Sequence, residues 1–326
     1  MIITETPLRI SFAGGGTDFG YYYLDHGGYV VSAAIDKSVF VIVAGRFDDQ
    51  IYINYSKKEI VDSVREIQNC IVREALIIVG VDRGIEITLM ADIPSTGTGL
   101  GSSSSFAVGI LNALHKFKGE SVSPEQLAEE ACEIEIQRCG NPIGRQDQYI
   151  AAFGGLAGFE FNSDSSVRVE RFGLSDAEEA EFAGSLRLIY SGVTRQANSI
   201  LSEQQDQYGQ NIETLHTIKA MANRTRTEIS NRNFSAIGPI LSESWNLKKT
   251  LAPGIETDAI AKLAGRSAES GMLGGKLCGA GGGGFWLSQY PADHIADLEK
   301  AFDGYRVFKV KFSKTGSRVI FDYVRD

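Results

Sequence analysis

The chain has 326 residues, 43% hydrophobic and 22% charged, a composition typical of a globular protein long enough for two domains. Its net charge of −9 argues against nucleic acid as a partner, and without a run of about 18 apolar residues or a signal-peptide pattern we expect a cytoplasmic protein that does not enter the membrane. The cysteines lack metal-site spacing and are expected as buried thiols in a reducing cytosol, at Cys70, Cys132, Cys139 and Cys278.

The first half of the chain mixes strand-like and helix-like segments. Strands are expected over 6–12, 38–45, 51–55, 85–91, 156–161 and 167–172. Helices are expected over 57–79, 104–118, 124–139 and 145–154. Ser123 and Pro124 suit the N-cap and the first position of the third helix, which Asn141-Pro142 ends.

The second half is predicted to contain longer helices. Helices are expected over 195–233, 235–251, 255–270 and 293–302, and strands over 186–190, 285–290 and 305–313. Because both halves mix strands and helices, we predict two α+β domains, residues 1–183 and 184–326.

The segment 93–106, IPSTGTGLGSSSSF, is the strongest functional signal in the sequence. Its glycines let backbone N–H groups close around an anion, because no Cβ blocks the approach. The apolar segment that follows predicts a helix, and a helix N-terminus favours phosphate. The segment therefore predicts a phosphate-binding loop, and the alternative is a polar loop with an ordinary serine cap.

Two common nucleotide motifs do not fit this chain. The pattern GxxxxGK[ST] is absent. A GxGxxG match at 279–284 precedes the strand-like FWLSQY, whereas the dinucleotide-binding version opens a helix, so a dehydrogenase is not expected. We interpret 279–284 as an ordered loop that approaches a backbone or a ligand, since its flanks are apolar.

Three acidic residues stand out in the segment that precedes Gly154. Asp147 lies in the nearly uncharged sequence GRQDQYIAAFGG, which favours a functional role. Glu133 and Glu135 lie near a helix end, and an acid two turns from another can share a metal–phosphate site. For Glu133 a solvated helix face is the preferred interpretation.

Three segments, 7–18, 94–104 and 276–284, together resemble the GHMP kinases, and the resemblance covers essentially the whole chain. The sequences TPLRISFAGGGTDF, GLGSSSSF, PIGRQDQY and LCGAGGGGF resemble the bacterial D-glycero-D-manno-heptose 7-phosphate kinases and fucokinase-like enzymes of that family. The resemblance implies an N-terminal ribosomal-protein-S5-like domain, a C-terminal ferredoxin-like domain and a site in the cleft between them.

The resemblance also implies roles for individual residues, with ATP and Mg²⁺ as cofactors. Asp147 matches the general base, and Arg9 matches the arginine beside that acid in galactokinases. Glu135 and Ser103 match the Mg²⁺ ligands, with Glu133 as the alternative carboxylate. The ATP-binding residues are then Gly97, Gly99, Leu100, Gly101, Ser102, Ser103 and Ser104. The substrate-binding residues are Gly15, Gly16, Thr17, Asp18, Arg195, Gly281 and Gly282.

The activity implied is ATP-dependent phosphorylation of the anomeric hydroxyl of a heptose 7-phosphate. Gly15-Gly16 replaces the Glu-His of galactokinases, which argues against galactose and leaves Thr17 and Asp18 as the sugar-facing pair. Arg195 is the candidate cation for the acceptor's phosphate, and the alternative is a surface arginine. A kinase for an unphosphorylated sugar such as L-fucose and a non-catalytic sugar-sensing protein are the competing functions, although Asp147 and Glu135 argue against the latter.

Overall fold

A large antiparallel sheet forms the frame of the N-terminal half. The computed structural model describes residues 1–94, 97–194 and 197–323. The strands of this sheet are β1 (Ile2–Ala13), β2 (Gly28–Gly45), β3 (Ile51–Asn54), β4 (Lys58–Val61), β5 (Ile85–Ala91), β6 (Leu156–Phe161), β7 (Val167–Arg171) and β12 (Arg318–Asp322). Their order is β12-β1-β2-β5-β3-β4, with β6 and β7 continuing from the first part of β2, and β3 pairs with β5 in parallel.

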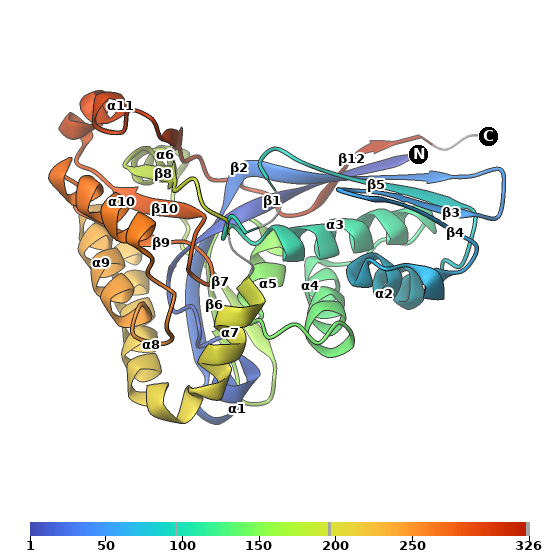
Figure 1. The fold of residues 1–326 in the computed structure, drawn as a ribbon, viewed down its shortest axis with the longest axis horizontal. Coiled ribbons are helices and arrows are strands. Elements are labelled where there is room, and N and C mark those ends of the chain that lie inside the picture. The colour runs from blue at the N-terminus through green and yellow to red at the C-terminus, as the bar shows by residue number, and fades with distance from the viewer. Residues whose placement is uncertain (95–96, 195–196, 324–326) are drawn as a thin grey trace.

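Helices cover one face of this sheet (Figure 1). The helices of the N-terminal half are α1 (Gly20–His26), η1 (Val64–Glu66), α2 (Cys70–Val79), α3 (Ser102–Phe117), α4 (Pro124–Cys132), η2 (Glu133–Arg138), α5 (Gln146–Phe153) and α6 (Asp176–Gly184). Helix α3 packs on β1 and β2, and α2, α4 and α5 pack against α3. This arrangement fixes the start of α3, where the glycine–serine loop ends.

A smaller sheet carries the C-terminal half. Its strands are β8 (Leu186–Tyr190), β9 (Gly274–Leu277), β10 (Phe285–Gln289) and β11 (Arg306–Lys309), in the antiparallel order β11-β8-β10-β9. The helices are α7 (Ala197–Asp206), α8 (Tyr208–Ser230), η3 (Phe234–Ala236), α9 (Ile237–Lys248), α10 (Asp258–Glu269), η4 (Ala292–Asp297) and α11 (Leu298–Ala301). Helices α9 and α10 pack on this sheet, while α8 also contacts β1 and β2.

A shared apolar core joins the two halves. Phe12 of β1 stacks on Phe182 of α6 with 5.2 Å between ring centroids, and Leu188 and Phe285 of the smaller sheet belong to the same buried cluster. The predicted boundary at residues 183 and 184 falls at the end of α6. Strand β12, however, returns to pair with β1, so the N-terminal sheet contains a segment from the predicted second domain. The domain bounds 1–183 and 184–326 therefore stay a prediction.

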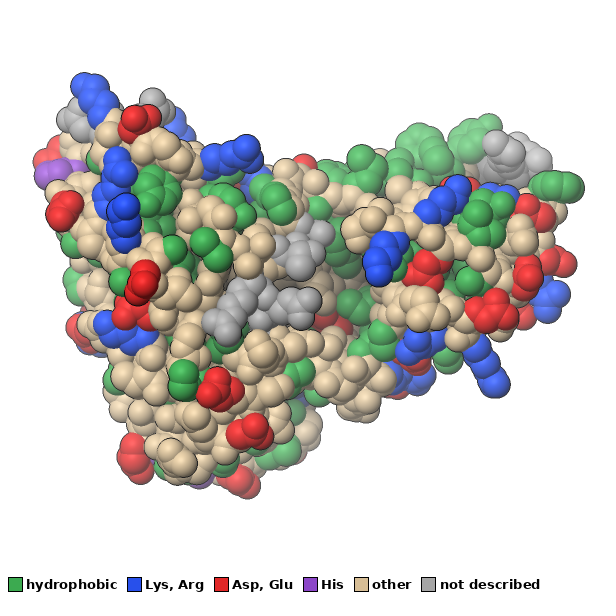
Figure 2. All heavy atoms as spheres, viewed as in Figure 1, with side chains coloured by type: hydrophobic (Ala, Val, Ile, Leu, Met, Phe, Trp, Pro, Cys, Tyr) green, Lys and Arg blue, Asp and Glu red, His purple; other side chains and the backbone are tan. Residues whose placement is uncertain are grey.

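The opposite face of the large sheet is open near the two chain ends (Figure 1). Figure 2 shows hydrophobic side chains along the upper edge of this half, and the exposed apolar residues of β5 and β12 include Met90, Ile320 and Phe321. Within the described ranges, no helix combines the length and the apolar character needed to cross a bilayer.

The predicted helix over 57–79 is wrong in its first half. Residues Lys58–Val61 form β4, which pairs with β3, and α2 begins only at Cys70, where the Asn69 side chain accepts a hydrogen bond from the Val72 N–H. Alternating side chains and a cross-strand partner therefore override the helix propensity of this charged segment. Helices α1 and α6 and strands β9 and β12 were not predicted.

The expectation of four free thiols is also wrong. Cys70 at the start of α2 and Cys139 after η2 form a disulfide across 69 residues of sequence, with their Cα atoms 5.9 Å apart. The sequence spacing could not indicate this pairing, because it depends on two helix ends that meet only in the fold. Cys132 and Cys278 are free and buried as expected.

Candidate active site

A cavity of about 560 Å³ lies between the two halves. Its N-terminal wall consists of the end of β1, the loop after it, the glycine–serine loop and the start of α5. Its C-terminal wall consists of α7, α8, α9, β9 and the first residues of the glycine run. The cavity therefore collects all of the motifs that the sequence pointed to, together with side chains that no motif contained.

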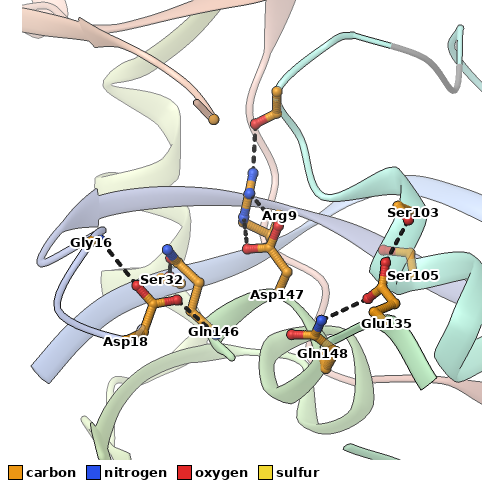
Figure 3. A network of polar contacts seen from close by, with 12 residues as sticks. Arg9, Gly16, Asp18, Ser32, Ser103, Ser105, Glu135, Gln146, Asp147 and Gln148 are labelled. Atoms are coloured by element: carbon orange, nitrogen blue, oxygen red, sulfur yellow. Dashed lines mark hydrogen bonds and ion pairs between the residues drawn. The ribbon is translucent and has the colours of Figure 1, made fainter. Parts of the chain in front are cut away.

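Arg9 and Asp147 lie side by side in this cavity (Figure 3). The Arg9 Nε donates to Asp147 Oδ1 at 2.7 Å, and Nη2 donates to Oδ2 at 2.5 Å. The remaining Nη1 donates to the Gly99 carbonyl oxygen at 2.6 Å. Arg9 therefore orients the carboxylate and fixes its position relative to the glycine–serine loop, because a guanidinium makes bidentate contacts in a rigid plane.

Glu135 is completely buried and faces the first turn of α3. Ser103 Oγ donates to its Oε1 at 2.5 Å, and Gln148 Nε2 donates to its Oε2 at 2.6 Å. Burial raises the pKa of Glu135, and the charge of Asp147 adds to that rise, although the three side-chain hydrogen bonds from Ser103, Ser104 and Gln148 oppose it. A nearby cation would relieve the cost of ionising this carboxylate.

The donor set fits Mg²⁺. This cation prefers hard oxygen ligands and is commonly held by one or two carboxylates together with substrate phosphates. Glu135 and the Ser103 hydroxyl both line the cavity, and Ser102 Oγ, also in its wall, is buried without a hydrogen-bond partner. Within the described residues no cluster of three or more metal-ligating side chains occurs, so the remaining ligands would be phosphate and water oxygens.

A π-helical turn separates the two candidate carboxylates. In η2 the Cys139 N–H donates to the Ile134 carbonyl at 2.8 Å, an i to i+5 contact. Glu135 points inward, while Glu133 is partly exposed and pairs with Arg138. Such wide turns often occur at functional sites because they turn one side chain out of the helical register. The geometry favours Glu135 over Glu133 as the ligand.

The glycine–serine loop has the backbone conformation that its glycines predict. Gly97, Gly99 and Gly101 have φ values of 68°, 77° and 75°, and a Cβ on Gly99 would lie 2.4 Å from the Cys278 carbonyl oxygen. Gly101 is the N-cap of α3, and Ser102, Ser103 and Ser104 of the first turn line the cavity, so a helix N-terminus lies at its wall. Leu100 is buried in the core, and its carbonyl accepts the Arg9 N–H at 3.0 Å, so this residue anchors the loop through its side chain.

The loop after β1 contributes an acid to the cavity. Asp18 is 1% exposed and accepts the N–H groups of Gly16 at 3.0 Å and Gln146 at 3.1 Å (Figure 3). Burial raises the pKa of Asp18, and these hydrogen bonds oppose the rise. Gly15 and Gly16 also line the cavity.

The expected orientation of Thr17 toward the sugar is wrong. Its hydroxyl donates to the Gly14 carbonyl at 2.8 Å and accepts the Tyr29 N–H at 3.1 Å, and its side chain is fully buried. Thr17 therefore closes the turn that holds Asp18 in place. The hydroxyl has no free donor for a ligand.

The glycine run contacts the cavity at an earlier point than expected. Gly279 and Ala280 line it, whereas Gly281 and Gly282 are absent from its wall and pack against Ile255, to whose carbonyl Gly282 donates at 2.9 Å. The assignment of Gly281 and Gly282 to direct substrate contact is therefore not supported. Arg195, the expected phosphate ligand, lies outside the described residues.

The comparisons with known proteins agree with this geometry. The model of the GHMP kinases N terminal domain matches residues 54–155. A D-glycero-alpha-D-manno-heptose 7-phosphate kinase of Campylobacter jejuni is 30% identical over 301 residues, covering 87% of this chain and 88% of that protein. The chain belongs to the GHMP kinase family. A solved D-glycero-D-manno-heptose 1-phosphate kinase of Bacteroides thetaiotaomicron has the same fold, with a TM-score of 0.83 and 24% identity over 99% of this chain and all of that one.

A further similar protein is longer than this chain. An L-fucokinase/L-fucose-1-P guanylyltransferase of Bacteroides fragilis is 28% identical to this chain. The aligned region covers 86% of this chain and 34% of that protein. The two-domain α+β architecture of the GHMP kinases, expected from the sequence, is confirmed by the fold.

Two lysines of this GHMP kinase were missed at the sequence level. Lys248 ends α9, and Lys276 lies in β9; both line the cavity. Lys276 stands at the start of a recognised motif but received no role, and Lys248 stands beside Lys249 with no local signal to distinguish the two. Only the approach of the C-terminal half to β1 brings them to the site.

Proposed function

We propose that this GHMP kinase transfers the γ-phosphoryl group of ATP to the anomeric hydroxyl of D-glycero-D-manno-heptose 7-phosphate, giving the 1,7-bisphosphate. The observation that carries the proposal is the ion pair of Arg9 and Asp147, which lies in the cavity beside the phosphate loop. The choice of acceptor is supported by the Campylobacter jejuni relative, which the chain resembles over nearly its whole length.

The N–H groups of the glycine–serine loop and the Ser102–Ser104 hydroxyls would bind the phosphates of ATP. Glu135 and Ser103 would hold Mg²⁺, which neutralises charge on the phosphate oxygens when bound. Asp18 would accept hydrogen bonds from sugar hydroxyls, since it lines the cavity and its carboxylate oxygens have lone pairs beyond those that accept the N–H groups of Gly16 and Gln146. Each of these contacts serves positioning, which supplies most of the catalysis in phosphoryl transfer.

Asp147 would accept the proton of the sugar's anomeric hydroxyl while the oxygen of that hydroxyl attacks the γ-phosphorus of ATP. The new O–P bond forms while the bond between that phosphorus and the bridging oxygen of ADP breaks. Arg9 would hold the carboxylate in its reactive orientation and offset charge that develops on the phosphoryl oxygens. The reaction needs no redox group and would take place in the cytoplasm.

Phosphorylation of L-fucose is the second candidate, supported by the similarity to the Bacteroides fragilis enzyme. The deciding experiment is an ATP-dependent assay on heptose 7-phosphate, unphosphorylated heptose and L-fucose, with products identified by ³¹P NMR. We expect the highest kcat/KM on heptose 7-phosphate and a phosphorus signal from an anomeric phosphate. Preference for L-fucose would replace the proposed acceptor, and binding of sugar without turnover on any of them would indicate a sugar-sensing protein.

A further inference from the structure

Lys248 and Lys276 bring two ammonium groups into the cavity from the C-terminal half. Lys276 is 4% exposed and donates to the Phe12 carbonyl oxygen at 3.3 Å. Lys248 is partly buried and donates to the Gly279 carbonyl oxygen. Within the described part of the chain, neither lysine forms an ion pair with a carboxylate. A lysine ammonium has three N–H donors, so both retain donors for a further partner.

The charges around the two lysines do not neutralise them. The charged groups facing Lys248 are Lys276, Arg9 and Asp147, with the Cys278 thiol also nearby, and Asp147 is already engaged by Arg9 in a two-point ion pair. Burial and, to a smaller extent, the charge of Lys276 together lower the pKa of Lys248 to about 7. Burial likewise lowers the pKa of Lys276 to about 8, with Arg9 adding to the effect. Cations held together without an anion are costly unless a ligand supplies the negative charge.

The two lysines contact different sides of the site. Lys248 bonds to Gly279, and a Cβ on Gly279 would lie 2.4 Å from the Gly99 Cα of the phosphate loop. Lys276 donates to the carbonyl oxygen of Phe12, near the end of β1, and the loop that carries Asp18 follows this strand. Ser11 Oγ, beside Phe12 and also in the cavity wall, is buried without a hydrogen-bond partner. Lys248, Lys276 and the unpartnered Ser11 hydroxyl therefore line the cavity between the phosphate loop and the loop that carries Asp18.

We propose that Lys248 and Lys276 form a phosphoryl-binding site in the C-terminal half that completes the kinase centre, an inference that rests on the proposed function. Either of two phosphoryl groups could bind at this site. One is the terminal phosphoryl group of ATP on its way to the acceptor, and the other is the phosphate that the acceptor already carries. In both cases the remaining lysine N–H donors make charge-assisted hydrogen bonds to phosphate oxygens.

The kinetic test uses Lys248→Met, Lys276→Met and the double variant, since methionine keeps the length and removes the charge. Lys249→Met is the matched control, because Lys249 is the next residue and pairs with Glu256 at 3.8 Å outside the cavity wall. kcat and KM are measured on heptose 7-phosphate and on unphosphorylated heptose. Melting temperatures establish that each variant is folded.

The two sources predict different patterns. If the lysines bind the acceptor's phosphate, KM for heptose 7-phosphate rises by about tenfold or more and the kinetics on unphosphorylated heptose do not change. If they bind the transferred group, kcat falls by about tenfold or more on both acceptors, while the affinity for ADP is retained. Either pattern supports the site. A folded double variant whose kcat and KM both stay within about twofold of the wild type overturns it.

A binding measurement separates this inference from the choice of acceptor. Inorganic phosphate is titrated by calorimetry into the protein saturated with MgADP, so that the nucleotide already occupies the phosphate loop. We expect the wild type and Lys249→Met to bind phosphate alike and the double variant to bind about tenfold more weakly or worse. Equal binding by the double variant, or no binding by the wild type, overturns the site. Phosphate binding without turnover of heptose 7-phosphate leaves the site standing and rejects the proposed acceptor.

Discussion

Arg9 and Asp147 are 138 positions apart in the chain, yet their side chains meet in a two-point ion pair with N···O distances of 2.7 and 2.5 Å. One comes from a central strand and the other from the first turn of a helix, where a negative charge is favoured by the helix dipole. The same guanidinium bonds to the Gly99 carbonyl. The acid and the phosphate loop are therefore fixed to each other through one rigid side chain.

Asp147→Asn should nearly abolish turnover and leave nucleotide binding intact. The amide keeps the shape of the carboxylate but cannot accept the acceptor's proton, and a general base contributes about 10²- to 10⁴-fold. kcat and the ADP dissociation constant measure the two effects, with the exposed Asp303→Asn as control. A fall in kcat of less than about tenfold would reject Asp147 as the base.

Glu135→Gln should weaken Mg²⁺-dependent turnover, and higher Mg²⁺ concentrations should partly restore it. An amide oxygen is a poorer ligand for a hard cation than a carboxylate. Glu133→Gln is the matched control, because Glu133 pairs with Arg138 on the outside of the same helical turn. Turnover measured across a Mg²⁺ titration should shift for the first variant only, and the opposite ranking would assign the metal to Glu133.

Gly101→Val and Ser103→Ala should impair ATP use by different routes. A Cβ on Gly101 would lie 3.2 Å from both Arg9 Cγ and Asp147 Oδ2, at a φ of 75° that β-branched residues avoid. We expect this variant to lose both stability and nucleotide affinity. Ser103→Ala removes only a hydroxyl bonded to Glu135, so its melting temperature should change less than its Mg²⁺ dependence. Normal ATP binding by Gly101→Val would exclude this loop as the nucleotide site.

The stability of the ligand-free protein should rise between pH 7 and 9. Lys248 and Lys276 have folded-state pKa values of about 7 and about 8, below their ordinary 10.5, so in this range the unfolded chain binds more protons. Because the unfolded chain binds more protons, raising the pH shifts the folding equilibrium toward the folded state. Above the ordinary cysteine pKa of 9.0 the raised pKa of the buried Cys278 thiol opposes the trend. Melting temperatures should therefore depend less on pH in the Lys248→Met/Lys276→Met variant, and an unchanged slope would contradict this account.

Cys70→Ser should lower the free energy of unfolding without removing any group from the cavity. A disulfide restricts the unfolded chain and typically contributes about 2–4 kcal/mol. Denaturant unfolding with and without a reductant measures the effect in the wild type, and the variant should match the reduced protein. Cys132→Ser removes a free buried thiol and keeps the disulfide, so it should respond to the reductant as the wild type does. Two alkylatable thiols in addition to Cys132 and Cys278 would show that the bond does not form.

Much of the fold could be predicted, because the hydrophobic period and the helix caps depend on residues that are close together in the sequence. The strand over 85–91 has the predicted bounds, and the Ser123 side chain caps α4 as its sequence indicates. The segment Lys58–Val61 could not be assigned in this way, because its strand conformation depends on pairing with β3. Its charged residues favour a helix when considered alone.

The site shows the same limit at the level of single residues. The adjacent Thr17 and Asp18 carry similar local signals, but the turn at Gly14 buries the threonine hydroxyl and leaves the carboxylate at the cavity. The neighbouring Lys248 and Lys249 differ only in which way the end of α9 turns them. Motif spacing identifies the segment that reaches a site, whereas the direction of each side chain depends on contacts made by distant elements.

The pairing of β1 with β12 bears on how the chain folds during synthesis. Ile2 lies opposite Asp322, and the Met1 amino group donates to the carbonyl oxygen of Tyr323, 322 positions away. On the ribosome, the edge of β1 that pairs with β12 therefore stays unpaired until residues 318–322 have emerged. Contacts of such long sequence separation form slowly, and open strand edges invite association with other chains. The unpaired edge of β1 in the nascent protein would therefore need protection from pairing with other chains. Pairing with β12 covers this edge and removes that risk of aggregation.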